Sequence, residues 1–191
     1  MFVYRFVLAG VLASTTILWL GSLFGDRVHF FGFGVPLATS NGIFRALVTL
    51  VSIAGAPAAG FLSDWLGKRW PVVGVTSILG GLGLWMMSQP FLAISITGGF
   101  LSQITGGSIG SLVPAISGDG IDKARQGRAL GIIYTLGDFG STLGPPIALG
   151  LLNTGKVSIH WIYQNCALVF LLLGFFSWGR ARLEKSRKKT V

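Results

Sequence analysis

Six apolar runs, each about as long as a bilayer is thick, constrain this chain more than any other feature. They cover residues 6–24, 42–62, 72–89, 91–117, 130–152 and 161–179. A helix needs about 20 mostly apolar residues to cross the hydrocarbon core. Of the 191 residues, 51% are hydrophobic and only 11% are charged, whereas soluble domains carry about 25% charge. The runs therefore predict an all-α membrane protein, in which residues 1–179 form a bundle of six transmembrane helices.

The charged residues predict how this bundle is oriented. The net charge is +9, and most Lys and Arg fall in gaps on one predicted side, whereas Arg27 and Lys156 fall on the other. Because Lys and Arg are retained in the cytoplasm, both termini are predicted to be cytoplasmic, and residues 180–191 form a basic cytoplasmic tail. This clustering indicates anionic lipid rather than nucleic acid as the partner of the charge. The cytoplasmic set is Arg5, Lys68, Arg69, Lys123, Arg125, Arg128, Arg180, Arg182, Lys185, Arg187, Lys188 and Lys189.

A short charged turn separates the second and third runs. It reads G-x-x-x-D-x-x-G-K-R, from Gly60 through Asp64 and Gly67 to Lys68 and Arg69. The glycines permit a tight reversal, the basic pair marks the cytoplasmic face, and the carboxylate requires a cation or a helix N-terminus. The pattern resembles the loop between the second and third helices of each half of a major facilitator superfamily transporter.

That resemblance implies a role for the loop. In the family, the Asp docks near the start of a helix of the opposite half and locks one conformation, so Asp64, Lys68 and Arg69 are expected to act as gate residues. Trp65 stands where the family usually has Arg, which leaves Asp64 with fewer local partners. The alternative is a simple helix cap accompanied by charges that fix the topology.

A second motif runs from residue 137 to residue 150. Gly140 and Gly144, like Gly137 and Ser141, are four residues apart, which favours close approach of another helix. The adjacent Pro145 and Pro146 are expected to kink the helix because they interrupt its hydrogen bonds. The stretch is similar to the G-x-x-x-G-P motif on the fifth helix of the superfamily's drug antiporters. Tight packing alone is the alternative explanation.

Asp138 is the most informative single residue. It follows Arg128, which we place at the cytoplasmic edge, by ten residues, so its Cα is expected roughly 15 Å deep. An ionised carboxylate at that depth is costly unless it faces water or a partner. Asp138 could exchange a proton, bind a cationic or hydroxylated substrate, or form a structural ion pair.

Three further polar residues lie inside predicted helices. Arg45 precedes Leu62 by 17 residues, roughly 25 Å, which places it near the outer interface. Its side chain could reach the headgroups, or point inward to pair with Asp138 or attract an anionic substrate. Gln103 and Tyr134 are expected to line a cavity or to bond a neighbouring backbone. We find no catalytic set, metal spacing or phosphate loop, and we expect neither an enzyme nor a cofactor.

The resemblance implies half of a secondary active transporter in a bacterial-type plasma membrane. Such a half moves a small solute by alternating access, with proton coupling as one option, and needs a second six-helix half. In the family, the fourth helix of a first half usually carries R-x-x-x-G-x-G, and the stretch before Gly106 has no Arg. This absence and the basic tail favour the C-terminal half, whereas the G-P motif is best known from a fifth helix. The competing hypothesis is a six-helix membrane scaffold or sensor without transport activity.

Overall fold

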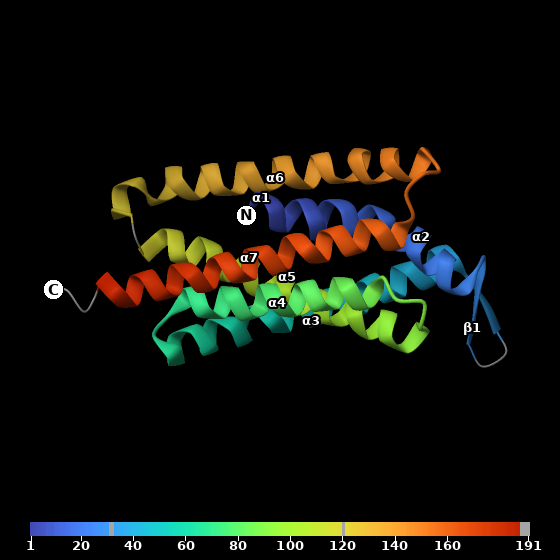
Figure 1. Ribbon diagram of the computed structural model, residues 1–191, viewed down its shortest axis with the longest axis horizontal. Coiled ribbons are helices and arrows are strands. Elements are labelled where there is room, and N and C mark those ends of the chain that lie inside the picture. The colour runs from blue at the N-terminus through green and yellow to red at the C-terminus, as the bar shows by residue number, and fades with distance from the viewer. Residues whose placement is uncertain (31–32, 120, 188–191) are drawn as a thin grey trace.

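The computed structural model describes residues 1–30, 33–119 and 121–187. Its first helical segment is continuous from Phe2 to Phe24 and comprises three elements, α1 (Phe2–Tyr4), the π-helical η1 (Arg5–Leu12) and α2 (Ala13–Phe24). Long helices make up most of the remainder (Figure 1): α3 (Leu37–Leu66), α4 (Arg69–Met87), α5 (Leu92–Asp119), α6 (Lys123–Asn153) and α7 (Ile159–Arg187).

Each of the six apolar runs lies in a helix, apart from residues 88, 89 and 91 at the α4–α5 connection. Four helical segments of the described chain are long and apolar enough to cross a membrane, namely Phe2–Phe24, Leu37–Leu66, Arg69–Met87 and Ile159–Ala181. The helices α5 and α6 are also long, with 28 and 31 residues, but they contain many Gly, Ser and Thr residues. The all-α membrane architecture is therefore confirmed, and the count of six crossings stays a prediction.

A short hairpin, which the sequence did not predict, follows α2. Its strands β1 (Arg27–Phe30) and β2 (Phe33–Pro36) pair antiparallel, with Arg27 opposite Pro36. Each strand has only four residues, which is the lower limit for a recognisable alternating pattern. The hairpin lies at the same end of the molecule as the α4–α5 and α6–α7 connections (Figure 1).

Helices in this bundle pack through small residues. The helix α4 lies against α5 and α7, α3 lies against α5, and η1 lies against α6. A methyl group on Gly83 would lie 2.8 Å from the Gly98 carbonyl oxygen of α5, and one on Gly74 would lie 3.3 Å from the Gly174 oxygen of α7. Such close backbone approach supplies van der Waals contact where lipid removes the hydrophobic driving force between helices.

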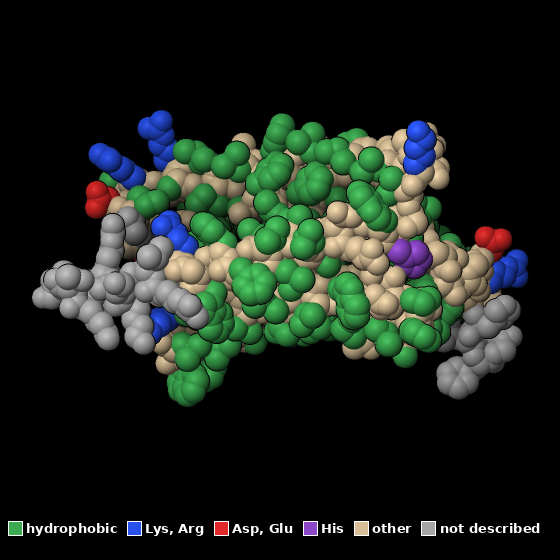
Figure 2. Space-filling model, in the orientation of Figure 1, with side chains coloured by type: hydrophobic (Ala, Val, Ile, Leu, Met, Phe, Trp, Pro, Cys, Tyr) green, Lys and Arg blue, Asp and Glu red, His purple; other side chains and the backbone are tan. Residues whose placement is uncertain are grey.

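The core lies where the first helical segment meets α4 and α7. Trp19, Tyr163 and Phe170 are fully buried there. The Trp19 indole nitrogen donates to the Met87 carbonyl at 3.0 Å, so its polar atom is satisfied inside the core. By contrast, the flanks of the bundle expose large apolar side chains, and Lys and Arg gather near its ends (Figure 2). This distribution suits a surface that faces lipid.

Candidate functional site

The first helical segment and α6 touch through their backbones. A methyl group on Gly144 would lie 2.5 Å from the Cα of Gly10, and one on Gly140 would lie 2.6 Å from the Phe2 carbonyl oxygen. Both glycines belong to the small-residue face that the sequence indicated. The Ser141 carbonyl, to which Pro145 offers no N–H, also faces Gly10. The two prolines lie inside α6, which continues past them to Asn153.

This contact fixes the partner of Asp138. The two segments run in the same direction (Figure 1), and Arg5 precedes Gly10 by five residues while Asp138 precedes Gly144 by six. The guanidinium of Arg5 consequently reaches Asp138 and forms an ion pair with its carboxylate. Arg5 also lies over the Tyr134 ring, 5.7 Å from its centroid. We call Arg5, Tyr134 and Asp138 the seam cluster.

Two expectations from the sequence are corrected here. Arg5 was expected at the cytoplasmic edge, but it lies beside Asp138, which is 15 residues from either end of α6. The shift arises because the first helical segment packs against the middle of α6 rather than beginning level with its end (Figure 1). Asp138 and Arg45 were also possible ion-pair partners, and the structure instead pairs Asp138 with Arg5.

The seam cluster is open on one side. The Asp138 side chain is 64% exposed and the Arg5 side chain 29% exposed. Asp138 lies halfway along a 31-residue helix, so its exposed face cannot contact hydrocarbon without a large energetic cost. Water or another protein surface must therefore cover this face when α6 is embedded in a membrane.

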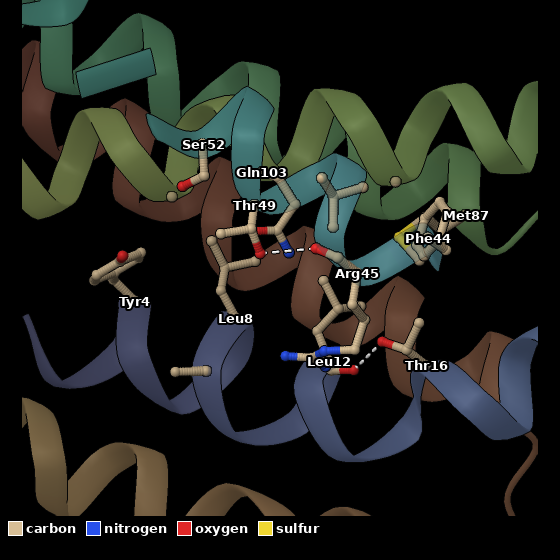
Figure 3. Close-up of a pocket in the computed structure, with 14 residues that line it drawn as sticks. Tyr4, Leu8, Leu12, Thr16, Phe44, Arg45, Thr49, Ser52, Met87 and Gln103 are labelled. Carbon is tan, nitrogen blue, oxygen red and sulfur yellow. Dashed lines mark hydrogen bonds between the residues drawn. The ribbon is translucent and has the colours of Figure 1, made fainter. Parts of the chain in front are cut away.

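A cavity of about 200 Å³ lies between the first helical segment, α3 and α5. Figure 3 shows side chains from these segments converging on it. Each helix contributes residues three or four apart, which therefore share one face. The lining residues are Tyr4, Leu8, Ala9, Leu12, Thr16, Phe44, Arg45, Val48, Thr49, Ser52, Met87, Gly99, Gln103 and Gly106.

Arg45 points inward to this cavity. Its Nη1 donates to the Ala13 carbonyl of α2 at 2.7 Å, so its guanidinium turns toward the neighbouring helix and not toward lipid headgroups. Thr49 donates to the Arg45 carbonyl at 2.7 Å, one turn along α3 (Figure 3). Arg45 and Gln103, two of the sequence candidates, therefore lie together, whereas Asp138 and Tyr134 do not line the cavity.

Several polar side chains that the sequence analysis missed also line the cavity. These include Tyr4 and Ser52, which, like Gln103, make no side-chain hydrogen bond within the described residues. A spacing of four residues joins Tyr4 to Leu8 in the first segment, and Arg45 to Thr49 in α3. Reading such spacings across several helices at once was the signal that could have found the cavity.

In the charged turn between α3 and α4, Gly67 makes the tight reversal, but Asp64 is not a helix cap. Gly67 has φ +60°, and its N–H bonds the Asp64 carbonyl at 3.2 Å, which ends α3 in a left-handed cap. Gly67 thus supplies the sharp reversal, whereas Gly60 lies inside α3. Asp64 does not cap α4, because the capping position is Lys68 and no side chain bonds there. The α3 helix continues past Asp64 to Leu66, so the Asp64 carboxylate lies near the C-terminus of this helix.

Arg69 has a partner within this chain. Its guanidinium bonds Asp119, at the end of α5, at 3.0 Å. Nearby, the Arg180 guanidinium of α7 lies 5.9 Å from the centroid of the Trp70 ring. These contacts join the ends of α4, α5 and α7. Of the three expected gate residues, Asp64 and Lys68 are exposed and form no salt bridge within the described residues.

No metal centre is assembled in the described part of the chain, where no group of three or more His, Cys, Asp or Glu side chains is suitably placed. Cys166, the single cysteine, is buried. The polar groups of the candidate site are therefore the Arg5–Asp138 ion pair, the Arg45 cation and the hydrogen-bonding side chains around the cavity.

Comparison with known proteins agrees with this architecture. The sequence model of the Major Facilitator Superfamily matches residues 1–191. Among curated proteins, the class C tetracycline resistance protein of Escherichia coli is 33% identical over 162 residues, which are 82% of this chain and 38% of that protein. The chain thus spans well under half the length of this relative. No solved structure matches it. Because the family match extends from end to end, the chain belongs to the Major Facilitator Superfamily.

Proposed function

We propose that this chain is a six-helix half of a secondary active transporter, which moves a small solute across the membrane by alternating access. Membership of the family and the likeness to a tetracycline resistance protein support transport in general. The observation that carries the proposal further is the seam cluster, where an ion pair is exposed halfway along a helix of membrane-spanning length.

The energetic argument starts from lipid. An ionised side chain at the bilayer centre costs about 2.5–3.5 kcal/mol even by insertion scales, and a scaffold helix has no need of one. The exposed face of Asp138 therefore suits a water-filled passage, or a surface that closes over that passage. A sensor or scaffold remains the alternative, and it would require neither this charge nor the cavity beside Arg45.

A second six-helix unit is expected to cover the open face. The chain corresponds to only 38% of its curated relative, so this unit either belongs to the same polypeptide or is a separate chain. Asp64 supports the idea, because a carboxylate near a helix C-terminus is unfavourable with the helix dipole and it has no salt bridge among the described residues. Docking of Asp64 on the second unit would supply the missing positive partner.

The charged residues support one orientation of this chain in the membrane. Residues 1–179 form the six-helix domain in a bacterial-type plasma membrane, with the start of the first helical segment directed toward the cytoplasmic side, and 180–191 form the basic tail on that side, of which 188–191 lie outside the described residues. Lys and Arg gather at the end that holds the α3–α4 and α5–α6 connections, which supports this orientation (Figure 2). The absence of an Arg before Gly106 favours the C-terminal half.

Proton coupling would use Asp138. When its carboxylate accepts a proton, the charge attraction to Arg5 is lost, and only the weaker contact with the Tyr134 ring remains between Arg5 and α6. Protonation would thereby loosen the contact between the first helical segment and α6. Release of the proton to the other side would restore the pair and reset the conformation.

The test is proton-driven uptake into liposomes, with the polypeptide reconstituted as its host cell makes it. A panel of small solutes, including tetracycline, is offered with an imposed pH gradient. The variant Asp138→Asn should abolish uptake driven by the gradient and leave exchange of solute across the membrane, which need not move a proton. The matched control Asp122→Asn removes an exposed carboxylate at the start of α6 and should behave as the wild type.

Two results would count against the proposal. Normal gradient-driven uptake by Asp138→Asn would remove this residue from coupling. Failure of the wild-type polypeptide to move any solute of the panel, with or without a gradient, would favour the scaffold or sensor instead.

A further inference from the structure

We propose that the cavity beside Arg45 binds the carboxylate of a small, amphipathic organic anion. This inference rests on the proposed transport function and specifies its substrate class. It concerns a different site from the seam cluster, because neither Asp138 nor Arg5 lines the cavity.

Charge is the first argument. Of the 14 residues that line the cavity, only Arg45 is charged. Its partner, the Ala13 carbonyl, is neutral, so the positive charge is not cancelled as that of Arg5 is by Asp138. A guanidinium has five N–H donors, and one of its nitrogens binds Ala13. The remaining donors suit a carboxylate, which Arg binds in a two-pronged geometry.

The remaining walls predict the rest of the ligand. Tyr4, Ser52 and Gln103 offer two hydroxyls and an amide with no side-chain hydrogen bond to the described protein, so they can bond polar atoms of a ligand. Phe44 supplies an aromatic wall, held between the rings of Trp19 and Phe100 at centroid distances of 5.4 and 5.7 Å. Leu, Val and Met side chains complete the lining. A volume of about 200 Å³ suits a single-ring acid.

Three probes of similar shape separate charge from size. Benzoate carries the carboxylate, benzamide is its neutral counterpart, and benzylammonium carries the opposite charge. Binding is measured by titration and by the rise in melting temperature of the purified chain in a detergent without phospholipid. The wild type should bind benzoate, bind benzamide more weakly, and not bind benzylammonium.

Variants then assign the binding to Arg45. A hydrogen bond to a charged group contributes about 1.5–3 kcal/mol, so Arg45→Gln should weaken benzoate binding by roughly ten- to a hundredfold and leave benzamide binding nearly unchanged. The matched control Arg128→Gln removes an exposed Arg from α6 and should change neither benzoate binding nor benzamide binding. If Arg45→Gln does not fold, Gln103→Glu keeps Arg45 and supplies an internal counter-charge, and it should abolish benzoate binding.

The outcomes are distinct. Equal loss of benzoate and benzamide binding in a folded Arg45→Gln protein, or undiminished benzoate binding in either cavity variant, would overturn the assignment. Stabilisation by phosphatidylglycerol without any by benzoate would show a lipid headgroup site and overturn it as well. Because binding is measured without a gradient, benzoate binding in a protein that moves no solute would uphold the site and refute transport.

Discussion

Arg5 and Arg45 both lie among apolar helices, but the two regions treat their charges differently. In the seam cluster, Arg5 meets a full negative charge on Asp138, and the pair lies on an open face. In the cavity, Arg45 meets only the dipole of the Ala13 carbonyl. The first region is neutral as a whole, whereas the second keeps a net positive charge.

This difference separates two tasks that one arginine could not perform together. A neutral pair can be broken and remade by a single proton, so it suits a conformational step. An arginine held by a carbonyl keeps its charge at every stage, so it suits recognition of an anion. The predictions below test whether the regions are as independent as this comparison requires.

The largest effect is expected at the backbone contact that positions the seam cluster. Gly144→Leu would drive a side chain into the main chain of Gly10, because a Cβ alone would lie 2.5 Å from its Cα. We expect a loss of at least about 3 kcal/mol, at the upper end of overpacking costs. Gly150→Leu is the control, since nothing lies within 4 Å of its Cβ position. Thermal unfolding in detergent provides the measurement, and equal melting of the two variants would contradict a specialised contact.

An intermediate effect is expected from a double-mutant cycle on the ion pair. Asp138→Asn leaves Arg5 uncompensated, and we expect a loss of about 1–3 kcal/mol, between that of an exposed pair and that of a buried pair. Combining it with Arg5→Gln should recover much of this loss, because neither charge then remains. Combining it with Arg45→Gln should give an additive loss. Recovery by Arg45→Gln instead would show that the two regions share their charges.

The smallest effect is expected inside the cavity. A methyl group on Gly106 would lie 3.4 Å from both the Leu8 side chain and the Ser52 hydroxyl, which is ordinary contact. Gly106→Ala should therefore raise stability by about 0.5–1 kcal/mol through helix propensity, and weaken benzoate binding by filling space. Gly131→Ala, where nothing lies within 4 Å, should bring the same gain in stability with unchanged binding. A loss of benzoate binding in both Gly106→Ala and Gly131→Ala would show that the loss does not arise from a smaller cavity, and would contradict this prediction.

The helices of this fold could be predicted from the sequence, because run length and apolar composition are local properties. The spacing of Gly140 and Gly144, and of Gly137 and Ser141, predicted a contact face on this helix. This spacing did not reveal that Gly10 is the partner of Gly144, since the small residues of one helix do not specify which other helix packs against them. For the same reason the pairing of Arg5 with Asp138, 133 residues apart, depends on a register that only the packed structure defines.

The cavity was only partly predictable for a related reason. Arg45 and Gln103 were recognised because a charge or an amide within an apolar run is conspicuous. Tyr4 and Ser52 are ordinary residues in membrane helices and gain significance only from what lies opposite them. The turn at Gly67 was predictable, but the end of α3 was not, so the sequence placed Asp64 as a possible cap of α4 when it belongs to the last turns of α3.

The glycine contacts between helices have a consequence for the evolution of this chain. At Gly10, Gly83, Gly98 and Gly144, the neighbouring backbone occupies the place where a Cβ would stand. A core leucine can be exchanged for several residues of similar volume, but no amino acid is smaller than glycine. Every mutation at these positions adds atoms, so they have no neutral alternatives. Sequence drift is therefore expected to proceed through the large apolar residues that face lipid, while these four glycines are among the most constrained positions of the protein.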